Sequence, residues 1–350
     1  MKILHTSDMH LCNERRETLE ALKEILRVAQ NLSVDLLTIG GDLFNSDRDA
    51  EVLRPELREV FQGNGFPVIA ILGNHDSYIC SRNLDFGPDL RIAAGDHFST
   101  YPFGEVVLVA VPYRDRPDDS LLSEIGNAVT DYETRILLLH CTLDFGFSPY
   151  DFGDEPGKSY FPITKAMLSR LGYDYVLAGH FHTQIYRMSL GEGRQFVYPG
   201  SPVSLSKKER GRRHGFLIDT EAKKAESVRL NTFYYDFLAA EVRPGRERET
   251  IKEIQKWVLD KSADDCSLEI DIKGFIETSE SDFREALGDL GGKVDVHLNY
   301  REVKQVLSHP LFRRFREKLE AIPSLGEKDE VENLVLDIMS QLLAGRTLRE

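Results

Sequence analysis

Two histidines, His180 and His182, stand one residue apart in the segment GHFH at 179–182. They directly follow the apolar run 174–178, which is typical of a buried strand. Neutral imidazole is the commonest side-chain ligand of metal ions, so a pair at the end of a strand indicates a coordination site. Taken alone, the pair is explained as well by two polar loop residues. The rest of the chain must decide between these interpretations.

Further polar side chains, most of them candidate ligands, follow other apolar runs along the chain. They are Asp8 and His10 in SDMH, Asp42 in GGDLFN, Asn74, His75 and Asp76 in GNHD, and His140. In open α/β sheets, ligands bind outside the carboxyl ends of the strands, so side chains from five strand exits would converge on one place. We therefore predict that GHFH completes a metal site that begins at residue 8.

The chemistry of this set favours two divalent ions. Two carboxylates, an amide oxygen and at least four imidazoles suit manganese, iron or zinc. Seven groups are too many for one ion, whereas two metals about 3.5 to 4 Å apart that share one carboxylate accommodate them. Asp42, central in the order, is the expected bridge. Such a pair clamps a phosphorus centre for in-line attack and attracts a phosphodiester despite the net charge of −14.

The elements that position these residues alternate between strand and helix patterns. Short aliphatic runs lie at 2–4, 34–39, 67–72, 105–111, 135–139 and 174–178. They are typical of strands buried on both faces. Residues 14–30 carry an apolar stripe through Leu19, Leu22, Leu26 and Ala29, and residues 51–62 carry a weaker one. This order predicts an α/β fold in which helices cover the sheet.

Length and composition bound the class of protein. A chain of 350 residues predicts one large domain and at least one smaller one. We expect a cytoplasmic protein, because no window is apolar enough to span a membrane and residues 1–10 lack the apolar region of a signal peptide. The four cysteines are scattered without CxxC spacing, which predicts free thiols.

The net charge argues against a broad basic face that coats nucleic acid. One local basic run stands out, KKERGRRH at 207–214. Its candidate contacts to a phosphate backbone are Lys207, Lys208, Arg210, Arg212 and Arg213. A solvated hairpin tip explains such a run equally well.

The pattern changes beyond about residue 232. Strand patterns at 237–242, 267–274 and 293–300 alternate with helical patterns at 247–261 and 279–290. Leu268, Ile270 and Ile272 alternate with charged residues, which predicts a small sheet with one solvated face and helices on the other. Two more helical patterns follow, marked first by Phe312, Phe315 and Leu319 and then by Val331, Leu334, Val335, Ile338 and Leu342. We expect domains at 1–232, 233–300 and 301–350.

The set DMH, GDLF, GNHD, His140 and GHFH resembles the calcineurin-like metallophosphoesterase superfamily over about residues 1–230. GDLF, GNHD and YPGSP (198–202) are similar to the nuclease subunit of SbcCD-type DNA repair complexes, the relatives of the meiotic-recombination-eleven nuclease. The resemblance implies an α/β sheet sandwich flanked by helices, with a smaller α+β capping domain that helps hold DNA. It also implies manganese, a homodimer, and C-terminal helices that bind the coiled coil of a partner ABC-type ATPase. The capping domain could instead be a plain accessory domain, and the helices could instead pack on it.

The resemblance also implies residue roles. One metal is held by Asp8, His10, Asp42 and His182, and the other by Asp42, Asn74, His140 and His180. His75 is then the histidine that stabilises the transition state or protonates the leaving oxygen. Asp76 orients His75 or caps the following turn. No covalent nucleophile is needed, since a bound metal makes water acidic enough to attack.

Two positions depart from the family pattern. Relatives often carry His or Asp at the position of Asn45, where it touches the catalytic histidine, so this neutral amide leaves the balance of exonuclease and endonuclease activity open. Leu72 stands where protein phosphatases of the superfamily carry an arginine, which favours a diester substrate. The remaining histidines match no motif and are expected to be structural or exposed: His5, His97, His297 and His309.

The sequence therefore favours a two-metal phosphodiesterase that acts on DNA in double-strand break repair. A small-molecule or cyclic-nucleotide phosphodiesterase would use the same chemistry. A DNA-end-binding scaffold with a vestigial metal site is the alternative from another class of protein.

Overall fold

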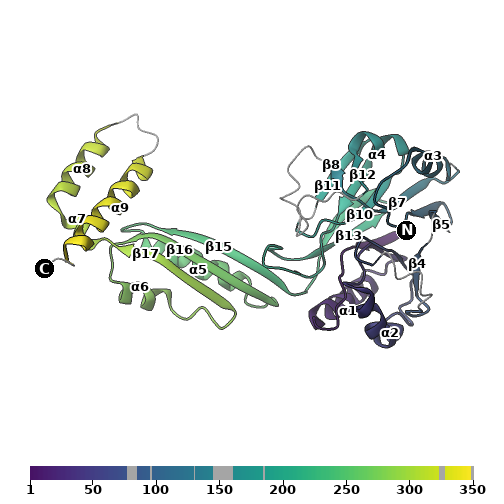
Figure 1. Ribbon diagram of the computed structural model, residues 1–350, viewed down its shortest axis with the longest axis horizontal. Helices are drawn as coiled ribbons and strands as arrows, with labels where there is room; N and C mark the ends of the chain where they lie inside the picture. Colours follow the sequence, from purple (N-terminus) through teal and green to yellow (C-terminus); the bar gives the residue numbers. More distant parts are fainter. Residues whose placement is uncertain are drawn as a thin grey trace. The chain divides into compact units, whose positions relative to one another are not determined.

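The computed structural model describes residues 1–76, 85–94, 97–129, 131–144, 161–183, 186–322 and 328–347. The chain divides into two compact units, Met1–Tyr235 and Asp236–Glu350 (Figure 1). Cys12, Cys141 and Cys266 are free thiols, as expected, and Cys80 lies outside the described residues. No helix in the described part of the chain is long and apolar enough to cross a membrane.

The first sheet of unit 1 has the strand order β14-β13-β1-β2-β3-β4. These strands are β1 (Lys2–Thr6), β2 (Leu36–Gly40), β3 (Val68–Ile71), β4 (Leu90–Ala93), β13 (His214–Asp219) and β14 (Lys224–Arg229). β1 to β4 are parallel, and β13 runs antiparallel to both of its neighbours. Helices α1 (Arg16–Asn31) and α2 (Asp47–Val60) bury the predicted stripe, including Leu19, Leu22 and Leu53, against one face.

The second sheet has the order β11-β12-β10-β7-β6-β5. Its strands are β5 (Ser99–Phe103), β6 (Val106–Ala110), β7 (Thr134–His140), β10 (Tyr175–Gly179), β11 (Tyr186–Gly191) and β12 (Arg194–Tyr198). Helices α3 (Asp119–Asn127) and α4 (Lys165–Leu171) pack on its outer face. Two short strands, β8 (Leu143–Asp144) and β9 (Ile163–Thr164), pair beside it.

The two sheets pack face to face. Ile3 and Leu36 of the first sheet share one buried core with Leu108, Ile136 and Leu177 of the second. Unit 1 therefore has helix, sheet, sheet and helix layers, which confirms the predicted sandwich flanked by helices. The strand and helix patterns alone suggested a single sheet covered by helices. The structure corrects this expectation, because the six predicted strands divide between two sheets, three in each.

His5 joins the two sheets below the strand exits. Its Nδ1 lies 3.0 Å from the Thr38 hydroxyl on β2, and its Nε2 lies 3.2 Å from the Ala178 carbonyl on β10. A carbonyl only accepts, so Nε2 carries the proton and Nδ1 accepts from the hydroxyl. Burial lowers the pKa of His5 to about 4, so the ring is neutral at pH 7. His5 is thus a structural residue, as expected.

Unit 2 contains a three-stranded sheet in the order β15-β16-β17. Its elements are β15 (Tyr234–Val242), α5 (Glu247–Asp260), β16 (Cys266–Ile276), α6 (Glu280–Leu287) and β17 (Val294–Glu302). Ile254 of α5 and Phe283 of α6 share a core with Ile270 and Ile272 of β16. The predicted alternation therefore places the helices on one face of the sheet, as expected.

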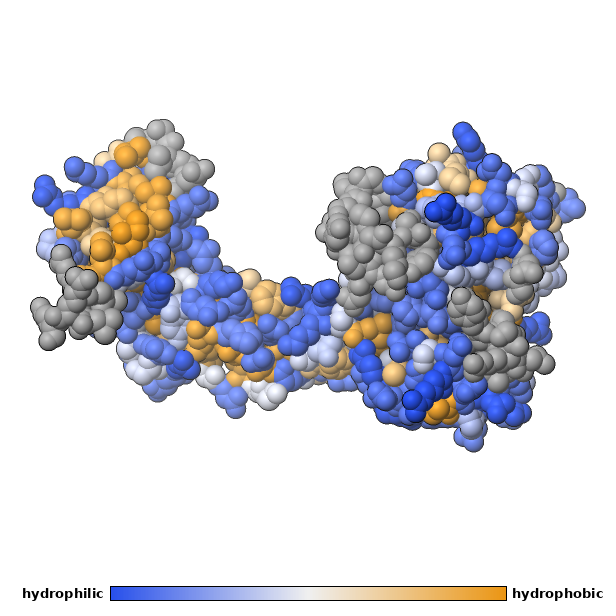
Figure 2. All heavy atoms as spheres, viewed as in Figure 1, coloured by the Kyte–Doolittle hydropathy of each residue, from blue (hydrophilic) through white to orange (hydrophobic). Residues whose placement is uncertain are grey.

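The unit ends in three helices with a small core of their own. They are α7 (Lys304–Ser308), α8 (Pro310–Glu320) and α9 (Lys328–Thr347). α9 packs through Leu336, which is buried with Val306 and Phe312. Much of the predicted apolar stripe of α9 faces solvent, since Leu334, Ile338 and Leu342 are 60%, 48% and 64% exposed. Figure 2 shows hydrophobic side chains gathered over α8 and α9.

Candidate metal centre

Two loops carry the first candidate ligands to one place. Asp8 and His10 lie on the loop after β1, and Asp42 lies on the loop after β2. The loops run side by side, because the Asp8 N–H donates to the Gly41 carbonyl (3.0 Å) and the His10 N–H donates to the Asp42 carbonyl (2.9 Å). All three residues have left-handed φ angles of 54°, 44° and 47°. Such strained backbone persists where surrounding contacts hold it, and it is typical of functional sites.

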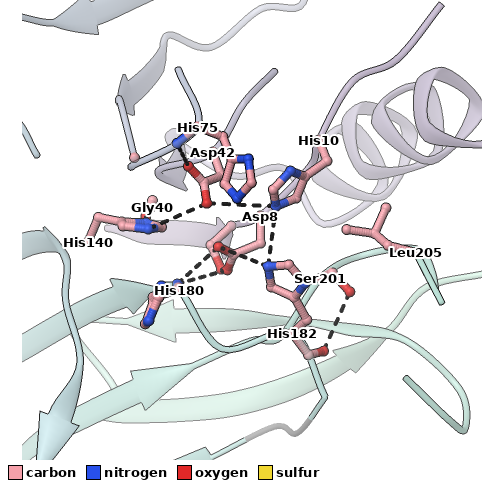
Figure 3. Close-up of polar contacts among 12 residues, drawn as sticks. Asp8, His10, Gly40, Asp42, His75, His140, His180, His182, Ser201 and Leu205 are labelled. Carbon is pink, nitrogen blue, oxygen red and sulfur yellow. Dashed lines mark hydrogen bonds and ion pairs between the residues drawn. The ribbon is translucent and has the colours of Figure 1, made fainter. Parts of the chain in front are cut away.

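Four side chains meet at the end of these loops (Figure 3). The ligand atoms of Asp8, His10, Asp42 and His182 all lie within 4.8 Å of one another. Nε2 of His10 is 3.2 Å from Nε2 of His182 and 3.7 Å from Oδ2 of Asp42. For metal–ligand bonds of about 2.1 Å, atoms at neighbouring coordination positions lie about 3 to 3.5 Å apart. These side chains therefore fit a single ion.

A second group of ligands lies across Asp42 from His10. Oδ2 of Asp42 is 3.5 Å from Nε2 of His140, which in turn is 2.9 Å from Oδ1 of Asn74. Nδ1 of His140 donates to the Gly40 carbonyl (3.0 Å), so Nε2 keeps its lone pair for this group. Figure 3 shows the Asp42 carboxylate between His10 and His140. One oxygen of Asp42 thus faces both groups of ligands.

His180 lies beside the second group. Its ring centroid is 5.3 Å from that of His140, and its backbone N–H donates to both carboxylate oxygens of Asp8 at 3.0 and 3.1 Å. Its φ angle of 119° is a further left-handed position at this centre. His180 therefore orients Asp8 through its backbone and places its ring near His140.

His75 lies beside the first group. Its backbone N–H donates to Oδ1 of Asp42 (3.0 Å), and its ring meets the His10 ring edge to face with centroids 4.8 Å apart. It does not belong to the set of four side chains whose ligand atoms cluster, as far as the described residues show. The ring of His75 therefore lies against His10, while its backbone holds Asp42.

The two candidate residues for supporting roles differ in burial. The fully buried carboxylate of Asp76 accepts from the N–H groups of Gly73 (2.7 Å) and Phe44 (3.1 Å), so it ties the GNHD turn to the GDLF loop. Asn45 is exposed, and its backbone N–H donates to the Leu11 carbonyl (3.1 Å). The structure thus shows Asp76 holding the turn that precedes it. A cap on the following turn falls outside the described residues, and the orientation of His75 by Asp76 and a contact between Asn45 and His75 stay predictions.

Glycines allow the loops to approach the ligands. A Cβ atom on Gly41, whose φ is +107°, would lie 2.2 Å from Nδ1 of His140. A Cβ atom on Gly73 would lie 2.1 Å from Oδ1 of Asp42. Any other residue at these positions would displace a candidate ligand, which explains the glycines of GGD and GNHD.

The electrostatics of the cluster favour a cation. Burial, and then the charge of Asp8, raises the pKa of Asp42, and burial lowers the pKa of His10 and His180 well below 6.5. Two buried carboxylates beside imidazoles that burial keeps neutral, such as His10 and His180, are costly without positive charge, and divalent ions supply that charge. Carboxylate, amide and imidazole donors without a thiolate suit manganese, iron or zinc. The residues present therefore fit a divalent metal centre.

One residue beside the cluster, Glu209, is not predicted from the sequence. Its buried carboxylate lies 3.1 Å from Nδ1 of His182. Burial lowers the pKa of His182, but the hydrogen bond to Glu209 and the charges of Asp8 and Glu209 outweigh it and raise this pKa to about 9. Glu209 lies within the basic run KKERGRRH, where the sequence pattern does not distinguish a single buried acid from a solvated one.

The basic run itself separates into exposed and buried members. Lys207, Lys208 and Arg210 are exposed, and Arg212 is half-buried. The prediction of a DNA contact is wrong for Arg213, which is only 4% exposed. Its guanidinium donates to the carbonyls of Ser201 and His182, so it supports the metal centre from inside the protein.

The fold and the centre together define the class as a metallophosphoesterase. A sequence model described as calcineurin-like phosphoesterase matches residues 1–184, more than half of the 350 residues. The chain belongs to this family, which confirms the resemblance. The matched region runs from β1 through GHFH and includes all seven candidate ligands.

Individual relatives are more distant. The chain is 24% identical over 293 residues to the DNA double-strand break repair protein Mre11 of Haloferax volcanii, covering 79% of this chain and 62% of that protein. It is 25% identical over 398 aligned positions to the SbcD component of the nuclease SbcCD from Escherichia coli K12, covering 100% of this chain and 94% of that one. The solved structure of TT1561 of Thermus thermophilus matches with a TM-score of 0.42 and 20% identity, over 65% of this chain and 98% of that chain.

Proposed function

We propose that this chain is a two-metal phosphodiesterase that hydrolyses DNA, the nuclease subunit of a two-component complex for double-strand break repair. The observation that carries this proposal is the Asp42 carboxylate, whose Oδ2 lies 3.7 Å from Nε2 of His10 and 3.5 Å from Nε2 of His140. A shared carboxylate between two ligand groups is the arrangement of a bimetallic phosphoesterase. The names of the relatives, Mre11 and the SbcD component of nuclease SbcCD, support DNA as the substrate.

In this proposal the ligands divide around Asp42. One ion is held by Asp8, His10, Asp42 and His182, and the other by Asp42, Asn74, His140 and His180. Manganese is the proposed ion, and the donor set supports it. When bound, the metals supply Lewis acidity and an acidic water at neutral pH.

The other residues of the centre act on the substrate. We assign to His75 the transfer of a proton from its ring to the leaving oxygen, because its ring faces the cluster while its backbone holds Asp42. Leu72, which is buried, leaves the position before GNHD without a guanidinium to grip a terminal phosphate. This absence of a positive side chain at Leu72 supports a diester substrate.

DNA contact is proposed for the exposed part of the basic run, Lys207, Lys208 and Arg210. The loop that carries them is anchored at the metal centre through Glu209 and His182. Since the whole chain has a net charge of −14, attraction to a phosphate backbone must come from local groups such as these. The capping role of the small α+β sheet, residues 233–300, belongs to the same proposal, as does a homodimer, which sedimentation velocity would measure.

The decisive assay compares DNA with small phosphodiesters. With Mn²⁺, the wild-type chain is expected to cleave linear duplex DNA and bis(p-nitrophenyl) phosphate. The double variant K207Q/K208Q is expected to keep the hydrolysis rate on the small ester but to bind DNA more weakly. Its DNA affinity should also fall less steeply with salt concentration, by the equivalent of about two phosphate contacts. Cleavage of cyclic nucleotides with intact duplex and single-stranded DNA would instead establish a small-molecule phosphodiesterase.

The partner proposed for the C-terminal helices, residues 301–350, is the coiled coil of an ABC-type ATPase. The exposed side chains of Leu334, Ile338 and Leu342 lie at i, i+4 and i+8, so they share one face of α9. The opposite interpretation, in which this stripe packs inside the chain, fits less well because α9 already packs through Leu336. An amphipathic helix docking its apolar face is a common recognition mode.

Substitution of this face tests the partner. L334S/I338S is expected to abolish co-purification with the cognate coiled-coil ATPase, because two of the three anchoring side chains lose their apolar contact. The thermal midpoint should stay unchanged, because both residues are exposed. L336S, which disrupts the helix core, serves as the contrasting variant that lowers the midpoint. Undiminished association of L334S/I338S would remove this role from α9.

A further inference from the structure

We infer that Glu209 is a positioning residue that aims Nε2 of His182 at the metal and fixes the basic loop to the metal centre. This inference rests on the metal site of the proposed function. It concerns a side chain outside the seven candidate ligands, on the loop between β12 and β13.

Glu209 is buried where its neighbours are exposed. Its relative exposure is 0%, although Lys208 and Arg210 on either side face solvent. A carboxylate is rarely buried unless donors satisfy it. Oε1 lies 3.1 Å from Nδ1 of His182, and Oε2 accepts from the Ser201 hydroxyl (2.9 Å) and the Leu205 N–H (2.8 Å). Both oxygens are thus engaged by groups of the metal centre and its supporting turn.

The contact decides which nitrogen of His182 is free. An ionised carboxylate can only accept, so Nδ1 of His182 carries a proton, and Nε2 is the nitrogen that can give up its proton to bind a metal. Nε2 lies 3.2 Å from Nε2 of His10 and 3.9 Å from Oδ1 of Asp8, inside the ligand group. Carboxylates that hold the far nitrogen of a ligating histidine raise the basicity of the ligand and fix its orientation.

The same network fixes the loop. Arg213 donates through Nε to the Ser201 carbonyl (2.8 Å) and through Nη2 to the Ser201 hydroxyl (3.0 Å) and the His182 carbonyl. The Ser201 N–H donates to the same His182 carbonyl (3.2 Å). GHFH, the PGS turn and the basic loop are therefore one hydrogen-bonded unit, with Glu209 at its centre.

Glu209→Gln tests the tautomer directly. The Leu205 N–H is a fixed donor, so the amide oxygen of glutamine must face it, and the amide NH₂ then faces Nδ1 of His182. This arrangement moves the ring proton to Nε2 and blocks the lone pair that the metal needs. We expect titration calorimetry of the full chain with Mn²⁺ to show one site weakened by about 10- to 100-fold and the other retained.

Two further variants separate this role from simple packing. E209D keeps an acceptor-only carboxylate, so it should hold Mn²⁺ more tightly than E209Q, even if both lower the thermal midpoint. E269Q is the matched control, because Glu269 also lies beside a histidine, 3.4 Å from Nε2 of His297, but in unit 2. It should bind Mn²⁺ like the wild type.

Wild-type Mn²⁺ affinity at both sites of E209Q would overturn the inference, as would equal losses in E209D and E209Q. DNA cleavage is not the readout, so the inference and the proposed nuclease activity fail separately. A wild-type chain that binds two Mn²⁺ ions but leaves DNA intact would remove the nuclease proposal. The role of Glu209 would still be decided by the Mn²⁺ titrations of its variants.

Discussion

Asp42→Asn is expected to lower phosphodiester hydrolysis by about 10³-fold or more, because the several kcal/mol that a metal supplies correspond to that factor. Asparagine has nearly the same shape as aspartate, so the substitution changes the metal-binding oxygen and little else. Its amide oxygen can still accept from the His75 N–H, now 3.0 Å from Oδ1. The NH₂ group then takes the place of Oδ2, between His10 and His140, where it can donate but cannot bind a metal.

The measurement combines two readouts. Calorimetry with Mn²⁺ should show the stoichiometry fall below two, and hydrolysis of bis(p-nitrophenyl) phosphate should fall with it. Glu192→Gln is the matched control, since that side chain is 83% exposed on the β11–β12 turn and should change neither readout. Two bound ions and wild-type turnover in D42N would show that Asp42 is not the bridge.

His75→Gln is expected to lower kcat by about 10² to 10⁴ while both metals stay bound. The contact from His75 to Asp42 is made by its backbone N–H, which the substitution keeps. The substitution removes the imidazole ring, which lies beside the ring of His10 with centroids 4.8 Å apart. The variant therefore separates proton transfer from metal binding, which D42N does not.

The leaving group distinguishes the two roles proposed for His75. A poor alkoxide leaving group, as in DNA, needs a proton far more than p-nitrophenolate does, so a general acid predicts a larger loss on DNA than on bis(p-nitrophenyl) phosphate. Equal losses on both substrates would point to charge stabilisation instead. Unchanged rates would remove the catalytic assignment, and His297→Gln, an exposed histidine of unit 2, is the control.

Part of the fold could be predicted because burial on both faces leaves a clear pattern. The continuous apolar runs of β2, β6 and β10 predicted buried strands in the right places. The strands β11 and β14 were not predicted, because their half-exposed residues carry no continuous run. The apolar runs also could not show that the predicted strands lie in two sheets that pack on each other, since an apolar side chain packs equally well against a helix or a sheet.

The sequence alone determined the order of the candidate ligands and their places at strand exits, because parallel strands bring their carboxyl ends to one edge. Tertiary structure decided the rest. Glu209 reaches His182 across 27 positions, and Arg213 reaches it across 31. Only these long-range contacts distinguish the buried side chains of the basic run, Glu209 and Arg213, from exposed ones such as Lys207. Burial depends on what packs against a residue, and local sequence does not contain that partner.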